Sequence, residues 1–169
     1  MNSIYRILTA SLLAVLLITM FAVAPVAGQT ETVGPMPGTD RETAGPNFTQ
    51  PVKLSPGDRH WYRFRYVFDE EVDSEPGNAV VSLKMDRVGC ASFEVTTSGR
   101  LNFPFDDEGE WVGPVGRGTP FNTGDDTIPS HLIWVGSGRF SETHFVIVRH
   151  HGDSPCTYTL SITGSPVVF

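Results

Sequence analysis

The stretch His60-Trp61-Tyr62-Arg63-Phe64-Arg65-Tyr66-Val67-Phe68 decides the fold, because two kinds of side chain alternate along it. Aromatic residues occupy every second position from Tyr62 to Phe68. Successive side chains of a β-strand point to opposite faces, so this period of two predicts a strand with one buried face. The opposite face then carries Trp61, Arg63 and Arg65.

The same alternation predicts further short strands before and after this stretch. Gly and Pro separate them at near-regular spacing, and no helical period follows Gly28. The predicted strands are 52–54, 60–68, 79–85, 90–97, 132–135, 143–149 and 157–163. We therefore expect an all-β fold, an antiparallel two-sheet β-sandwich or a jelly-roll-like arrangement.

The first 28 residues are typical of a secretory signal. Arg6 precedes an apolar run over residues 7–27, and small residues end that run at Gly28, where we expect cleavage. The run approaches the roughly 20 residues that span a bilayer, so an uncleaved membrane anchor is the alternative. The protein is therefore expected to be secreted, extracellular or at the cell surface.

The expected mature chain is divided into a linker and one domain. A chain of 169 residues that loses 28 keeps 141, which suits a single domain with its own core. Residues 29–50 are rich in Gly, Pro and Thr and offer scarcely any apolar side chain to bury. We predict a disordered linker over 29–50 and a β-sandwich domain over 51–169.

Charge and cysteine content narrow the class of protein. Loss of Arg6 with the signal changes the formal net charge from −7 to −8, which argues against a nucleic-acid partner. The two cysteines, Cys90 and Cys156, occur in a chain expected to reach an oxidising compartment, and we predict a disulfide between them. Two free buried thiols are the alternative.

Residues 98–129 break the regular spacing of strands. They contain six glycines and no clear alternation, and so long a connection is usually functional or disordered. Two acidic runs lie in this region, and hard oxygen donors in Gly-rich loops suit calcium. The candidate calcium ligands are Asp106, Asp107, Asp125 and Asp126. Solvated surface acids are the simpler interpretation, because the spacing does not follow an EF-hand.

Two motifs in order along the chain resemble a known family. Gly57-Asp58-Arg59-His60-Trp61-Tyr62-Arg63-Phe64 resembles the G-D-x-x-W-Y-x-F opening strand of bacterial pre-peptidase C-terminal (PPC) domains. Tyr158-Thr159-Leu160-Ser161-Ile162 resembles their closing Y-x-L-x-I strand, and the match covers residues 52–164. The resemblance implies a β-sandwich accessory domain with roles in export, in substrate or matrix binding, and sometimes in calcium binding. It does not imply peptidase activity.

Aromatic and cationic side chains suggest a binding surface. Such side chains stack on sugars or peptide groups, and an arginine flanked by glycines can present its guanidinium to an anion. The candidate residues are Trp61, Arg63, Arg65, Trp111, Arg117 and Trp134. The alternative is that Trp61 closes the rim of the core and the arginines form weak surface ion pairs.

No catalytic motif is complete. Ser137 lies between two glycines, but no helix is predicted after it. His150, His151 and Asp153 are of the types that bind zinc, but adjacent strand residues point to opposite faces, so a site would also need His131 or His144. We therefore expect a non-catalytic secreted binding module that needs no cofactor other than possible calcium and that contacts an extracellular polysaccharide or protein. The alternative is a small extracellular hydrolase whose site lies in residues 98–129.

Overall fold

The computed structural model describes residues 37–46, 49–67, 69, 71, 75–138, 141–165 and 167–169. The predicted signal and its cleavage site lie outside the described residues. No helix within the described ranges combines the length and the apolar character needed to cross a membrane.

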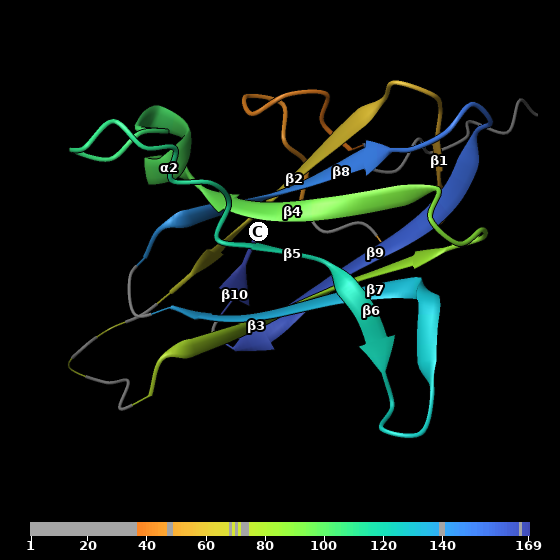
Figure 1. Cartoon of the computed structure of the whole chain (residues 1–169). Helices are drawn as coiled ribbons and strands as arrows, with labels where there is room; N and C mark the ends of the chain where they lie inside the picture. The colour runs from red at the N-terminus through yellow and green to blue at the C-terminus, as the bar shows by residue number, and fades with distance from the viewer. Residues whose placement is uncertain are drawn as a thin grey trace, which may run out of the picture. The chain divides into compact units, whose positions relative to one another are not determined.

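The described residues form two antiparallel sheets of five strands each (Figure 1). The first, here called the β3 sheet, has the order β1-β9-β3-β7-β6 and consists of β1 (Val52–Leu54), β9 (Cys156–Ser165), β3 (Gly77–Met85), β7 (Thr127–Gly138) and β6 (Thr119–Asn122). The second, the β8 sheet, has the order β10-β2-β8-β4-β5 and consists of β10 (Val167–Val168), β2 (Arg59–Tyr66), β8 (Thr143–His150), β4 (Ala91–Thr97) and β5 (Gly116–Arg117). The predicted β-sandwich is confirmed.

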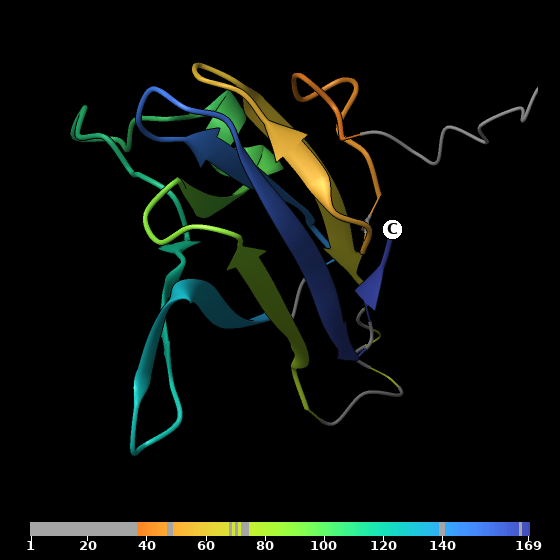
Figure 2. The same ribbon diagram turned by 90° about the vertical axis from the view of Figure 1, so that its right-hand side faces the viewer.

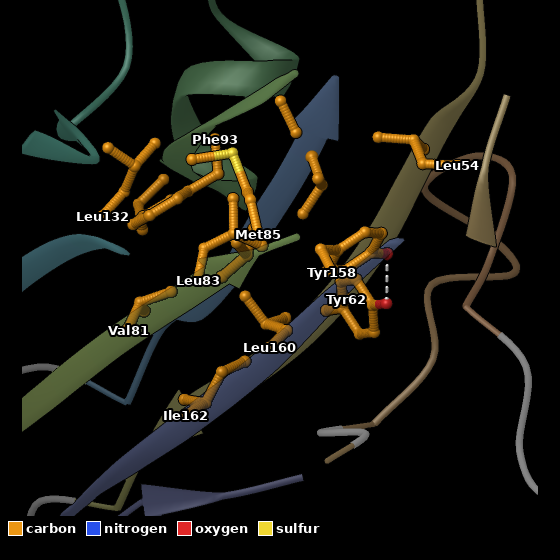
Figure 3. Packing of buried hydrophobic residues seen from close by; sticks show 14 of the residues in the cluster. Leu54, Tyr62, Val81, Leu83, Met85, Phe93, Leu132, Tyr158, Leu160 and Ile162 are labelled. Carbon is orange, nitrogen blue, oxygen red and sulfur yellow. Dashed lines mark hydrogen bonds between the residues drawn. The ribbon is translucent and has the colours of Figure 1, made fainter. Parts of the chain in front are cut away.

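The core lies between the two sheets, as the period of two predicts. Tyr62, Phe64 and Tyr66 of β2 are buried, while Arg63 and Arg65 between them are exposed. The β3 sheet contributes the facing aliphatic side chains, several of which Figure 3 shows: Val81, Leu83, Leu132, Leu160 and Ile162. The long strands of both sheets therefore have an apolar face that is buried against the other sheet.

A disulfide joins the sheets near one end of the core. Cys90 precedes β4 and Cys156 begins β9, and their Cα atoms are 6.2 Å apart. Both side chains are buried. The predicted Cys90–Cys156 bond is confirmed.

Residues 98–129 contain more regular structure than the sequence indicated. The short helix α2 (Ser98–Asn102) follows β4 directly, and β5, β6 and the first residues of β7 complete the region. The Thr97 hydroxyl accepts from the Arg100 amide, and the Glu142 carboxylate accepts from the Gly99 amide, so side chains satisfy two donors at the start of the helix. The β6–β7 hairpin extends away from the other strands in both views (Figures 1 and 2).

The prediction of a disordered linker over 29–50 is wrong for residues 37–46. Gly38 and Trp61 exchange backbone hydrogen bonds of 3.0 and 2.8 Å, and the Arg63 amide donates to the Gly45 carbonyl at 2.9 Å. Thr43 donates from its amide and its hydroxyl to Asp40, which closes the turn between the two glycines. Backbone pairing along β2 orders this segment, and a count of apolar side chains could not reveal it.

Candidate functional site

The outer face of the β8 sheet, turned away from the core, is partly apolar. On β8, Val146 and Val148 point into the core, yet Phe145 and Ile147 on the opposite side are only 5% and 3% exposed. Trp61 of β2 contacts Phe145 edge to face, with ring centres 6.1 Å apart. The strand β8 is therefore buried on both faces, and this second apolar layer forms the base of a surface feature.

Arg41 of segment 37–46 reaches across this layer. Its guanidinium carbon lies 5.7 Å from the centre of the Phe145 ring, a cation–π arrangement. Its Nη1 donates to the Asn102 side-chain oxygen at 2.6 Å. The ordered segment thus holds one arginine in place beside α2, over an aromatic ring.

Arg63 and Arg65 lie beside Arg41 on the same outer face. Both are exposed, and they lie two positions apart on the same face of β2. Strand β8 pairs with them on one side, with Phe145 opposite Arg63 and Thr143 opposite Arg65. On the other side, Val168 of β10 is paired with Arg65.

These three arginines line an open groove of about 430 Å³. The other residues that line it are Glu42, Phe64, Ser98, Thr143, Phe145, Val168 and Phe169. The groove combines cationic groups with hydroxyl groups and apolar surface. We call it the arginine groove.

The charges of the arginine groove are largely uncompensated. Among the described residues, the one ion pair joins Arg149 and Glu94, and it lies outside the groove. Arg63 and Arg65 make no side-chain hydrogen bond or ion pair with any described residue. The alternative in which acidic loops neutralise these two arginines is therefore not seen within the described part of the chain.

The predicted aromatic and cationic residues do not form one platform. Trp61 is partly buried against Phe145, and Trp134 packs on the core side of β7. A Cβ at Gly116 would lie 1.9 Å from Trp134 Nε1, and one at Gly118 would lie 2.3 Å from the Phe93 ring. The glycines around Arg117 thus admit aromatic rings of the core, which is a structural reason for the Gly-Arg-Gly sequence.

Trp111 lies on a separate surface, in the loop after α2. It is 63% exposed, and Phe103 and Phe105 of the same loop are 74% and 59% exposed. Trp111 pairs with Phe105 through an isolated bridge, and the Arg100 guanidinium donates to the carbonyls of residues 112–114 at 3.1 to 3.3 Å. Sequence reasoning identified Trp111 here but missed both phenylalanines, because their positions follow no period.

The candidate calcium ligands fall into two separate loops. The Asp106 carboxylate accepts from the amides of Glu108 and Glu110, so it closes its own turn. Asp125 and Asp126 lie at the tip of the β6–β7 hairpin, away from that turn in both views (Figures 1 and 2). Within the described ranges, the only close group of three metal-ligand side chains is Asp86, Cys90 and Cys156, and its cysteines are bonded to each other.

A buried hydrogen-bonded chain connects the two sheets near the disulfide end. The hydroxyl oxygens of Tyr62 and Tyr158 are 2.5 Å apart (Figure 3). His60 Nδ1 is 2.7 Å from the same Tyr158 oxygen. Burial raises the pKa of Tyr62 to about 12, and burial together with the neighbouring Tyr62 raises the pKa of Tyr158. Burial lowers the pKa of His60.

Two other histidines contact serine hydroxyls. His131 Nε2 is 2.7 Å from Ser82 Oγ, and His151 Nε2 is 2.6 Å from Ser92 Oγ. No described carboxylate lies within ion-pair distance of either imidazole, so neither pair has the third group that orients a catalytic base. Ser137 lies on an exposed position of β7, opposite Asn78 of β3.

Comparison with solved structures finds several chains of similar fold, two of which are described here. The chain is similar to the pre-peptidase C-terminal domain of collagenase from Bacillus anthracis, with 12% identity and a TM-score of 0.44 over 70% of this chain and 94% of that one. It is also similar to PliG of Aeromonas hydrophila, a periplasmic lysozyme inhibitor of g-type lysozyme, with 15% identity and a TM-score of 0.38 over 69% and 83%. No family model matches the chain, and no curated protein matches it.

Proposed function

We propose that this protein is a secreted, non-catalytic binding module that takes an anionic ligand in the arginine groove. The observation that carries the proposal is the position of Arg63 and Arg65, which line a groove of about 430 Å³ and have no ionic partner among the described residues. Guanidinium groups bind carboxylates, sulfates and phosphates through paired hydrogen bonds. An extracellular protein and an acidic polysaccharide both carry such groups.

Three further features support a binding role at this place. Arg41 is already held by Asn102 and Phe145, so it loses little side-chain freedom when a ligand arrives. The apolar surface of Phe145 and Phe169 adds contact area beside the charges. The Cys90–Cys156 disulfide suits a secreted or cell-surface location.

The test is direct titration of the exported protein with short anionic oligomers. Hexaglutamate and a galacturonate tetramer supply carboxylates on two different backbones, and a neutral dextran oligomer supplies none. We expect calorimetry to show binding of at least one anionic oligomer, weakened by added salt because the groove is open to solvent. The variant with both Arg63→Ala and Arg65→Ala should lose this binding.

The matched control is Arg59→Ala. Arg59 is exposed on the same face of β2 but does not line the arginine groove. The Arg59→Ala variant should bind the anionic oligomers with the same affinity as the unchanged protein. Absence of binding to every anionic oligomer, or binding that survives the double substitution, would overturn the proposed function.

A further inference from the structure

The backbone fixes the spacing of two cations in the arginine groove. Arg63 and Arg65 are two positions apart on β2, so their Cα atoms are about 6.6 to 6.8 Å apart and their side chains leave the same face. Hydrogen bonding holds β2 along both edges here, with β8 on one side and with Gly45 and β10 on the other. The distance between the two arginine attachment points is therefore rigid.

We infer that the ligand of the arginine groove is an extended peptide segment with acidic residues at alternate positions, an acid-x-acid motif. An extended peptide repeats its side chains on one face every two residues, with the same period as β2. Two alternate carboxylates then meet Arg63 and Arg65, while the residue between them points away. This inference rests on the proposed function and specifies its ligand.

The surroundings of the two arginines fit a short peptide. Phe145 forms an apolar floor between the strands, and Val168 and Phe169 are partly exposed at the rim, where they can contact aliphatic parts of a ligand. The hydroxyls of Ser98 and Thr143 also line the groove and can bond to a peptide backbone.

The charge of the whole chain argues against a long polyanion. The formal net charge is −7, and Glu42 stands at the groove itself. A long acidic polymer would extend beyond the arginines and be repelled by the net negative charge of the rest of the protein, whereas a segment of a few residues stays within the groove. Charge complementarity is thus local, which favours a short acidic motif of a protein partner over an acidic polysaccharide.

The experiment compares two blocked peptides of identical composition. Acetyl-Gly-Asp-Gly-Asp-Gly-amide places its carboxylates on one face of an extended chain, and acetyl-Gly-Asp-Asp-Gly-Gly-amide places them on opposite faces. Each is titrated into the isotopically labelled exported protein, and the amide signals of Arg63, Arg65 and Thr143 are followed by NMR. We expect a dissociation constant about three to five times lower for the alternating peptide, since one additional exposed ion pair is gained.

Single substitutions test whether the preference for the alternating peptide needs both arginines. Arg63→Ala and Arg65→Ala should each abolish the difference between the two peptides, while Arg59→Ala should retain it. Because all three side chains are exposed, the variants should fold, which thermal melting verifies.

The outcomes separate the inference from the proposed function. Equal affinity for the two peptides, a preference for adjacent acids, or tighter binding of a galacturonate tetramer than of either peptide would overturn the acid-x-acid motif, while the groove would remain an anion site. If neither the peptides nor any other anionic oligomer binds, the proposed function itself fails.

Discussion

The hydroxyl oxygens of Tyr62 and Tyr158 lie 2.5 Å apart between the two sheets. Tyr62 belongs to β2 and Tyr158 to β9, so this hydrogen bond crosses the sandwich at a place where most other contacts are apolar. Both tyrosine rings are almost fully buried. Of the two hydroxyl groups, His60 hydrogen-bonds to that of Tyr158. Tyr158 is therefore the middle member of the chain and Tyr62 is its buried end.

Tyr158→Phe should cost more stability than Tyr62→Phe. Loss of the Tyr158 hydroxyl leaves the buried Tyr62 hydroxyl and His60 Nδ1 without this partner, and we expect a loss of about 1 to 3 kcal/mol. Tyr62→Phe leaves the Tyr158 hydroxyl bonded to His60, with a loss of about 1 kcal/mol. Urea denaturation of both variants measures the difference. A double variant less destabilised than the sum confirms the coupling, and equal costs for the single variants would contradict the order of the chain.

Alkaline pH should weaken the fold through the same tyrosines. The pKa of Tyr62 is raised from 10.0 to about 12, so the unfolded chain loses this proton before the folded protein does. The contribution to stability is complete below pH 10 and declines as the pH rises from there through about 12. Urea denaturation over this range should show the decline, and the variant with both Tyr62→Phe and Tyr158→Phe should show a smaller one. An identical pH profile in that variant would assign the decline to other groups.

Long alternating strands were predictable from the sequence, and short elements were not. β2, β3 and β9 bury every second side chain, whereas β8 is buried on both faces. The positions of all four match the predicted strands to within about two residues at their ends. β5 and β10 have two residues each, too few for a period to show. Pro129 lies inside β7, where a proline normally argues against a strand.

The site was predictable only in part, because it joins segments that are distant in the sequence. Alternation correctly placed Trp61, Arg63 and Arg65 on one face of β2. Arg41 joins them through the backbone bonds of Gly38 and Gly45, which no side-chain pattern reveals. Trp134 does not lie on this outer face of the β8 sheet, because its strand β7 pairs with β3 in the β3 sheet.

Reduction of the disulfide should destabilise the protein. The Cys90–Cys156 bond closes a loop with a sequence separation of 66, and the chain-entropy model gives such a loop on the order of 4 kcal/mol. We expect a reducing agent to lower the melting temperature of the protein, and thiol titration of the unfolded oxidised protein to detect no free thiol. The variant with both Cys90→Ala and Cys156→Ala should melt at a temperature that the reducing agent does not change. Two titratable thiols in the oxidised protein would contradict the bond.

The two outer-surface tryptophans differ in how much of each ring the fold covers. The Trp61 ring is partly buried and packs edge to face on Phe145, while the Trp61 backbone pairs with segment 37–46. Trp111 is 63% exposed and contacts Gly113 within its own loop. Their substitutions should therefore separate a structural role from a surface role.

Trp61→Ala should remove about 2 kcal/mol or more from the free energy of unfolding, because the partly buried ring packs on Phe145. Trp111→Ala should change it by less than about 0.5 kcal/mol, as is usual at exposed positions. Urea denaturation followed by circular dichroism measures both values without relying on tryptophan fluorescence. In Trp61→Ala, loss of the ring contact should let Phe145 shift beneath Arg41 and weaken anion binding in the arginine groove, whereas Trp111→Ala should leave that binding intact. A large loss of stability in Trp111→Ala would show that the loop after α2 is part of the packed structure and not a free surface.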